Sequence, residues 1–230
     1  MHLTAEVLDL QESSKMERVS NYELTKRKSR EIFLNYDQSK MIEKFGLKSD
    51  ENYIYINFIG HLYRIQRYTG FLEWSENGFV DCVEADFNET LTVYDLLCDS
   101  KEGCQASGEY INLQSLSVLQ SSSKKLGDGL FGGKEKVFDK KEKAFSRVCE
   151  KLNGTPKGKG DVSYELPMFD FLSCMIQFWN SDEEFAASLQ IFLDKNVLSF
   201  LRYETVWYAV SHLLKRLKEE LDRELSLEEK

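Results

Sequence analysis

The strongest constraint on the fold comes from residues 160–217. Three segments rich in β-branched and aromatic residues are followed there by a long amphipathic helix, a succession typical of strands packing against a helix. The predicted strands are 162–166, 171–179 and 189–193, and the predicted helix begins at Tyr203. The second strand is apolar at nearly every position, which predicts burial on both faces at the centre of its sheet.

The rest of the chain mixes the same two patterns. Apolar residues recur every three or four positions in some segments and alternate in others. The predicted helices are 21–45, 90–98 and 134–152, and the predicted strands are 53–58, 62–67 and 71–75. Segment 108–116 fits either a strand or a loop. The sequence therefore predicts an α+β fold, in which antiparallel sheets pack against N-terminal, middle and long C-terminal helices.

Local signals refine these elements. Gly46 follows the last apolar position of the first helix, where a left-handed cap is expected. The basic residues Lys26, Arg27, Lys28 and Arg30 are expected on the outer face of that helix. Residues 167–170 are expected to connect the first two strands of the closing block.

We predict a single α+β domain over residues 20–225 with less regular ends. Residues 1–19 are expected to be a poorly ordered or short helical N-terminus, and 226–230 a frayed C-terminus. The stretch 120–133, rich in Ser, Lys and Gly, is expected to be a flexible loop.

The net charge of −9 disfavours binding to nucleic acid, because acidic surfaces repel phosphates. The segment 124–159 is an exception, with eleven Lys and Arg against five Asp and Glu. This basic segment could bind an anionic partner or the protein's own acidic surface. The alternative is a Lys-rich helix with one solvated face.

Neither a membrane nor a secretory setting is expected. The sequence contains no apolar run of the roughly 18 residues that a spanning helix needs, and its start lacks a cationic and then apolar signal. The five cysteines, an odd and scattered set, suit reduced thiols in a cytoplasm.

No sequence motif indicates a cofactor or a metal. The tract 127–134 lacks the spacing of a phosphate-binding P-loop and the preceding strand of a dinucleotide site. His61 and His212 are far apart in sequence, and the cysteine spacing is not that of a zinc site. We expect both histidines to be ordinary surface or half-buried residues, with His61 in the hairpin turn and His212 on the polar side of the last helix.

Acidic residues around Trp179 are the candidate binding residues. Asp182, Glu183 and Glu184 follow the buried strand that ends at Trp179, and loops at strand ends often carry function. The alternative is a β-turn whose charges are solvated. The full candidate set is Asp161, Asp170, Trp179, Asp182, Glu183, Glu184 and Asp194.

The closing block also carries a family resemblance. The residues in question are Gly160-Asp161-Val162, Trp179, Asp182-Glu183-Glu184-Phe185, Ile191-Phe192-Leu193-Asp194, Phe200-Leu201 and Glu204, with looser matches at Phe58-Ile59-Gly60, Tyr63, Tyr94 and Leu96-Leu97. In these residues the chain resembles a bacterial and archaeal family called domain of unknown function 3786, over about residues 20 to 218. The resemblance implies a setting in anaerobic redox or one-carbon metabolism, because some relatives carry an iron–sulfur cysteine domain ahead of this region. Here the first 80 residues contain no Cys, and the family supplies no catalytic residues.

The leading functional hypothesis is a non-enzymatic, cytoplasmic binding or accessory module with an unknown protein or small-molecule partner. One alternative is a hydrolase or transferase that uses an acidic cleft near Trp179. Another is a homodimer formed through the apolar stripe of the last helix, so both a monomer and a homodimer are open.

Overall fold

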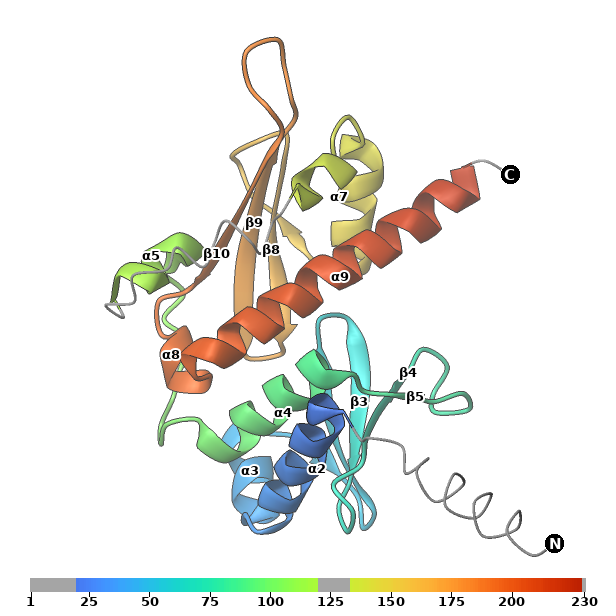
Figure 1. Cartoon of the computed structure of the whole chain (residues 1–230), viewed down its shortest axis with the longest axis vertical. Helices are drawn as coiled ribbons and strands as arrows, with labels where there is room; N and C mark the ends of the chain where they lie inside the picture. The colour runs from blue at the N-terminus through green and yellow to red at the C-terminus, as the bar shows by residue number, and fades with distance from the viewer. Residues whose placement is uncertain (1–19, 120–132, 229–230) are drawn as a thin grey trace, which may run out of the picture.

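The computed structural model describes residues 20–119 and 133–228, whose strands form two antiparallel sheets of five strands each (Figure 1). The first sheet keeps chain order, and the second has the order β6-β10-β9-β8-β7. Its central strand is β9, as predicted from the continuous apolar run. The strands are β1 (Lys48–Ser49), β2 (Tyr53–Phe58), β3 (His61–Gln66), β4 (Leu72–Ser75), β5 (Val83–Glu84), β6 (Tyr110–Asn112), β7 (Thr155–Pro156), β8 (Val162–Phe169), β9 (Leu172–Trp179) and β10 (Ser188–Asp194).

Helices connect and cover the two sheets, which confirms the predicted α+β class. The helices are α2 (Asn21–Leu34), α3 (Gln38–Phe45), α4 (Phe87–Asp99), α5 (Leu113–Leu119), the 3-10 helix η1 (Lys134–Val137), α7 (Glu142–Lys151), α8 (Val197–Phe200) and α9 (Tyr203–Glu228). None of these helices is long and apolar enough to cross a membrane.

A tight hairpin joins β2 to β3 and also links the two sheets. Its two turn residues, Ile59 and Gly60, have φ angles of 44° and 78°, the backbone of a two-residue turn that twists with its strands. Ile59 is a β-branched residue in a backbone conformation that such residues rarely adopt. Burial of its side chain and a hydrogen bond from its backbone amide hold it there. That amide donates to the carbonyl of Met168 in β8 at 2.9 Å. The hairpin therefore abuts the end of the second sheet.

Helix α9 crosses both halves of the molecule (Figure 1). It packs against α4 on one side and against α7 on the other. The predicted apolar stripe of this helix is buried within the chain, at Val206, Trp207, Val210, Leu213, Leu214, Leu217 and Leu221. The oligomeric state stays a prediction, but this stripe is occupied by the chain's own residues.

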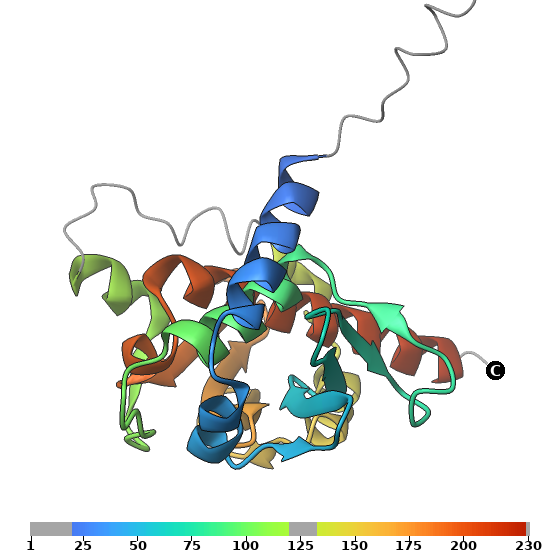
Figure 2. The same cartoon turned by 90° about the horizontal axis from the view of Figure 1, so that it is seen from below.

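Helices α2, α4 and α9 lie next to one another, with α4 in contact with both of the others. Viewed from below, they share one side of the molecule, while β2 and β3 lie on the other (Figure 2). This arrangement brings the start of α9 close to the side chains of α4 and creates the site described below.

Two predicted helices are each broken in the structure. The predicted helix 21–45 is α2 and α3, because the Asp37 side chain accepts the Ser39 and Lys40 amides and starts a second helix. The predicted helix 134–152 is η1 and α7. Lys140 between them has a φ of 58°, and its amide donates to Asn180 at 2.6 Å, so contacts with a distant loop override local propensity.

Other expectations need correction. Lys26 is buried rather than on the outer face, because its Nζ binds the Glu84 carboxylate of β5 at 2.8 Å. Residues 167–169 belong to β8 and are not a connection, since the strand continues with a bulge to Phe169. Segment 108–116 contains both β6 and the start of α5.

Two local predictions at helix ends are confirmed. Gly46 caps α3 with a φ of 60°, and α9 begins at Tyr203. Helix α9 includes residues 226–228, although the sequence predicts a frayed C-terminus there. The predicted N-terminal segment 1–19 and nearly all of the predicted loop 120–133 lie outside the described residues.

Candidate functional site

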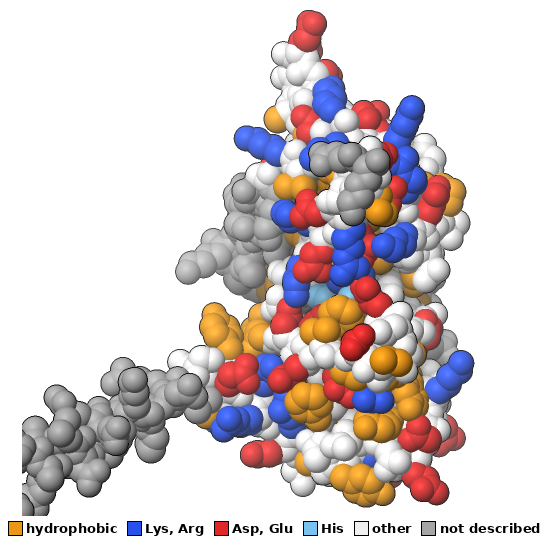
Figure 3. Space-filling view, turned by 90° about the vertical axis from the view of Figure 1, so that its right-hand side faces the viewer, with side chains coloured by type: hydrophobic (Ala, Val, Ile, Leu, Met, Phe, Trp, Pro, Cys, Tyr) orange, Lys and Arg blue, Asp and Glu red, His pale blue; other side chains and the backbone are white. Residues whose placement is uncertain are grey.

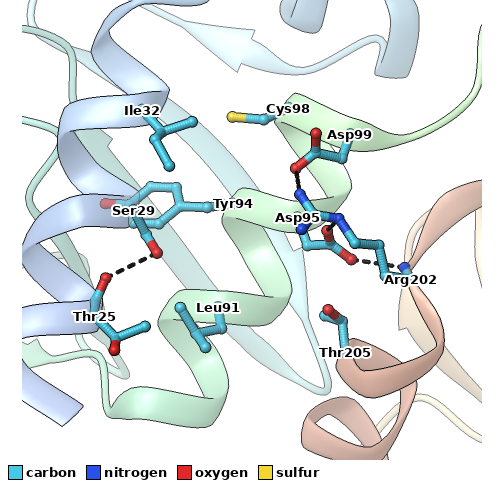
Figure 4. A pocket seen from close by; sticks show the side chains of 10 residues that line it. All are labelled: Thr25, Ser29, Ile32, Leu91, Tyr94, Asp95, Cys98, Asp99, Arg202 and Thr205. Carbon is cyan, nitrogen blue, oxygen red and sulfur yellow. Dashed lines mark hydrogen bonds and ion pairs between the residues drawn. The ribbon is translucent and has the colours of Figure 1, made fainter. Parts of the chain in front are cut away.

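A pocket of about 200 Å³ lies between α2, α4 and the start of α9, and we call it the α2–α4–α9 pocket (Figure 4). Ten side chains from these three segments line it. They are Thr25, Ser29 and Ile32 from α2, Leu91, Tyr94, Asp95, Cys98 and Asp99 from α4, and Arg202 and Thr205 at the start of α9.

Two carboxylates one helical turn apart form the acidic wall of the pocket. Asp95 and Asp99 are both held by Arg202, whose Nε lies 2.9 Å from Asp95 Oδ1 and whose Nη2 binds Asp99 (Figure 4). The Arg202 amide also donates to Asp95 Oδ2 at 2.7 Å. Asp95 thus accepts an N–H at the beginning of α9, where the helix dipole favours negative charge. The two carboxylates and one guanidinium leave a net charge of about −1.

Burial raises the pKa of two groups in the pocket, Asp95 and Cys98. It raises the pKa of the Asp95 carboxyl, while hydrogen bonds from the Arg202 amide and Thr205 oppose the rise. Burial, with the negative charges of Asp99 and Asp95, raises the pKa of the Cys98 thiol to about 12. At neutral pH Cys98 is therefore a thiol and not the nucleophilic thiolate.

The pocket hydroxyls of α2 and of Tyr94 donate to backbone carbonyls, whereas Thr205 donates to Asp95. Thr25 donates to the Asn21 carbonyl at 2.8 Å and Ser29 donates to the Thr25 carbonyl at 3.0 Å. Tyr94 donates to the Gly70 carbonyl. The Thr25 and Ser29 oxygens keep lone pairs as acceptors, whereas the Tyr94 oxygen already interacts with the Arg30 side chain. The pocket is therefore rich in acceptors and suits a ligand group that donates hydrogen bonds or carries positive charge.

A second group of titratable residues lies where α9 meets the first sheet. His61 Nε2 is 3.3 Å from Glu76, and Arg223 Nη1 is 2.6 Å from the same Glu76 oxygen. Arg216 and Arg223 each reach Glu220 at 3.0 Å. The guanidinium groups already take the positions that a cation would occupy. Figure 3 shows this face of the molecule, with histidine atoms lying between acidic and basic side chains.

The candidate residues from the sequence lie at opposite ends of the second sheet. Trp179 ends β9, with Asp161 before β8 and Asp182, Glu183 and Glu184 after β9 at the same end. Asp170 and Asp194 lie at the other end, because β8, β9 and β10 are antiparallel. An eight-residue strand spans about 25 Å, so these side chains do not share one cleft.

Most of these carboxylates have local structural partners. Asp182 Oδ1 accepts the Glu184 and Phe185 amides at 2.9 and 2.7 Å, and these hydrogen bonds lower the pKa of its carboxyl. Asp161 accepts the Asn180 amide at 2.7 Å, and Asp170 accepts the Asn57 side chain. Glu183 and Glu184 are exposed. A binding role for this set stays a prediction.

The residues of the α2–α4–α9 pocket are not among those predicted from the sequence. Asp95 lies in the predicted helix 90–98, Asp99 directly follows that helix four positions later, and Arg202 directly precedes another predicted helix. That pattern places the carboxylates on one helix face but does not show that the two helices meet. His212 is also corrected, since it is fully buried instead of lying on a polar face, and His61 is a buried residue of β3.

A family model described as a domain of unknown function (DUF3786) matches residues 37–216. The chain belongs to this family. The match includes the α4 wall of the pocket and Arg202, whereas the α2 wall precedes it. No curated protein and no solved structure matches the chain.

The structure explains one part of the family resemblance in physical terms. Gly160 has a φ of 91°, and a Cβ there would lie 2.7 Å from the Phe178 carbonyl oxygen. The next amide, of Asp161, donates to that same oxygen at 2.8 Å. In this domain of unknown function, Gly160 and Asp161 therefore fix the start of β8 against the end of β9.

Proposed function

We propose that this chain is a non-enzymatic binding or accessory module, and that the α2–α4–α9 pocket receives a basic side chain of a protein partner. The proposal depends on one observation: two carboxylates face one guanidinium in the pocket, which leaves a net negative charge, and the pocket's side-chain donors are already paired with carboxylates or backbone carbonyls.

The size of the pocket favours a single side chain. Its volume of about 200 Å³ is below the roughly 300–1,000 Å³ of typical small-molecule sites. Apolar contacts are available beside it, because Ile32 and Tyr36 are 50% and 41% exposed. Tyr36 is tied to the pocket by its hydroxyl, which donates to Asp99 at 3.4 Å. A partner surface that combines basic and apolar side chains fits this region.

Charge also favours such a partner. The whole chain carries −9, so a basic protein is attracted over longer distances and a like-charged one is repelled. The protonated Cys98 thiol and the ion-paired Asp95 offer binding contacts but no free nucleophile or base, which supports binding over catalysis.

Site-specific photo-crosslinking in cells tests the proposal. Ile32 at the pocket and Val80, which is 81% exposed in another loop, are each replaced by p-benzoylphenylalanine. We expect one discrete crosslinked protein from position 32 and none from position 80. The captured protein is then purified and its affinity measured.

The charge requirement is tested with Asp99→Asn, which retains hydrogen bonding but removes the negative charge. We expect the affinity to fall at least tenfold, since a hydrogen bond to a charged group contributes roughly 1.5–3 kcal/mol. Asp222→Asn is the matched control, because Asp222 is an exposed carboxylate paired with Lys218. Identical capture at both positions, or equal affinities for the two Asn variants, would contradict the proposal.

A further inference from the structure

Three potential metal ligands converge where α4 begins beside the middle of α9. Asp86 is the N-cap of α4, Glu89 lies in its first turn, and His212 projects from α9. One ligand atom from each lies within 4.8 Å of the other two. Glu89 and His212 are almost completely buried, whereas the Asp86 side chain is 39% exposed. The cluster thus has a buried floor and one side open to solvent.

The fold fixes the two carboxylates in this arrangement. Asp86 Oδ1 accepts the Glu89 amide at 3.0 Å, and the Glu89 side chain in turn accepts the Asp86 amide. The Tyr63 hydroxyl from β3 donates to Glu89 Oε1 at 2.8 Å. These hydrogen bonds explain the positions of both carboxylates without a bound ligand. Evidence for a ligand therefore has to come from His212.

The imidazole of His212 has a buried nitrogen that the described residues leave unsatisfied. Nδ1 has no hydrogen-bond partner among them, although His212 is 0% exposed. Phe58 stacks on the ring at 5.0 Å, and Nε2 lies 3.3 Å from the Tyr63 hydroxyl. A buried polar atom without a partner is unfavourable by about 1–3 kcal/mol. The orientation of the ring therefore calls for a partner at Nδ1.

The distance from Nδ1 to Glu89 Oε1 identifies the kind of partner. It is 3.6 Å, which is longer than a hydrogen bond. Two ligand atoms on a tetrahedral ion, with bonds of about 2.0–2.2 Å, lie roughly 3.3–3.6 Å apart. The gap is therefore close to what a metal ion between the two atoms would require.

We propose that Asp86, Glu89 and His212 form a binding site for a divalent transition-metal ion, with Zn²⁺ as the preferred ion. One imidazole nitrogen with two carboxylate oxygens is a donor set that suits Zn²⁺ better than Mg²⁺ or Ca²⁺, which take oxygen ligands. Three protein ligands leave a fourth position for water. The neighbouring His61, Glu76 and Glu220 cluster differs, because Arg216 and Arg223 fill it.

Lys215 competes with the metal ion and offers a sharp test. Its Nζ lies 2.8 Å from Asp86 Oδ2, at the exposed side of the cluster, and the side chain is 46% exposed. The ammonium group partly neutralises Asp86 and repels an entering cation. Removing that charge should strengthen metal binding, an outcome that a purely structural ion pair would not give.

The experiment uses the untagged full chain, stripped with a chelator and titrated with Zn²⁺ by calorimetry, with bound zinc measured after desalting. We expect one Zn²⁺ per chain. Asp86→Asn and His212→Gln should each weaken binding at least tenfold, and Lys215→Met should strengthen it at least tenfold. Asn is as good an N-cap as Asp, so Asp86→Asn keeps the capped helix. It decides the question if His212→Gln does not fold.

Glu76→Gln is the matched control, since it changes a carboxylate of the neighbouring cluster and should leave zinc affinity unaltered. Circular dichroism confirms that each variant is folded. The proposal is overturned if the unaltered chain binds no zinc after desalting. It is also overturned if Asp86→Asn binds zinc as tightly as the unaltered chain, because the zinc then lies elsewhere.

Discussion

The Asp194→Asn variant separates a structural role of this candidate residue from a binding role. Asp194 is 2% exposed at the end of β10, where its carboxylate holds the segment before β6. Oδ2 accepts the Ser107 and Gly108 amides, both at 2.9 Å. Oδ1 accepts the Ser107 hydroxyl at 3.0 Å and the Asn196 amide at 2.8 Å. Both oxygens face donors, and the three backbone amides cannot change direction, although the Ser107 hydroxyl can also donate to the Glu109 carbonyl.

The size of the expected stability loss follows from this arrangement, in which both oxygens of Asp194 act only as acceptors. An Asn side chain can place its oxygen toward only one pair of donors, so its NH₂ group faces the other pair. At least one hydrogen bond to a charged group is lost, at roughly 1.5–3 kcal/mol, and a partly buried N–H is left unpaired. We expect the free energy of unfolding to fall by about 2–4 kcal/mol. For a chain of this size that lowers Tm by roughly 4–16 °C.

Urea unfolding followed by circular dichroism measures the effect, with an unchanged m-value showing that stability alone has changed. Asp170→Asn is the matched control. Asp170 is exposed and, within residues 20–119 and 133–228, accepts only from the Asn57 side chain, so the same substitution should cost less than about 0.5 kcal/mol. If the two variants are equally stable, the carboxylate of Asp194 does not hold this segment, and the structural reasoning is refuted.

Two further predictions concern backbone strain and pH. Gly160→Ala should lower the free energy of unfolding by about 2–4 kcal/mol, because of its φ of 91° and the 2.7 Å approach of a Cβ to the Phe178 carbonyl. Gly158→Ala meets no atom within 4 Å and should change stability by less than about 1 kcal/mol in the same urea assay. Burial, with the positive charge of Arg216, lowers the pKa of His61 from 6.5 to about 4 in the folded chain. The unfolded chain then binds more protons between these values, so stability should fall as pH drops through this window, by at most about 1.4 kcal/mol per pH unit. His61→Asn should reduce that slope, and an unchanged slope would show that His61 does not contribute.

Much of the fold was predictable because its elements carry their own periodicity. The hairpin of β2 and β3, the three long strands of the second sheet and the start of α9 were all read from alternation and helical spacing. The central position of β9 followed from its continuous apolar run. The breaks were not predictable in the same way. The break between η1 and α7 depends on contacts of Asp139 and Lys140 with the loop at Asn180 and Ser181, about 40 positions away in sequence.

The candidate sites were beyond local reasoning. The acidic residues clustered in sequence, Asp182 to Glu184, lie in an exposed turn whose Asp182 side chain accepts the Glu184 and Phe185 amides, and their binding role stays a prediction. The residues that converge in space are Asp95 with Arg202, and Asp86 with His212, which are separated by more than 100 positions. Burial of Lys26 and His212 was missed for the same reason, since a distant partner or a packed neighbour decides it.

The sequence by itself determined the element types, the α+β class and the family, because side-chain periodicity and turn residues act over a few positions of the chain. Only the tertiary structure decided which polar side chains meet. Helix α9 crosses from one sheet to the other and brings Arg202 to α4 at its start and His212 to Glu89 at its middle. Charge and hydrogen bonding act through space, so their partners are fixed by the crossing of helices and not by spacing along the chain.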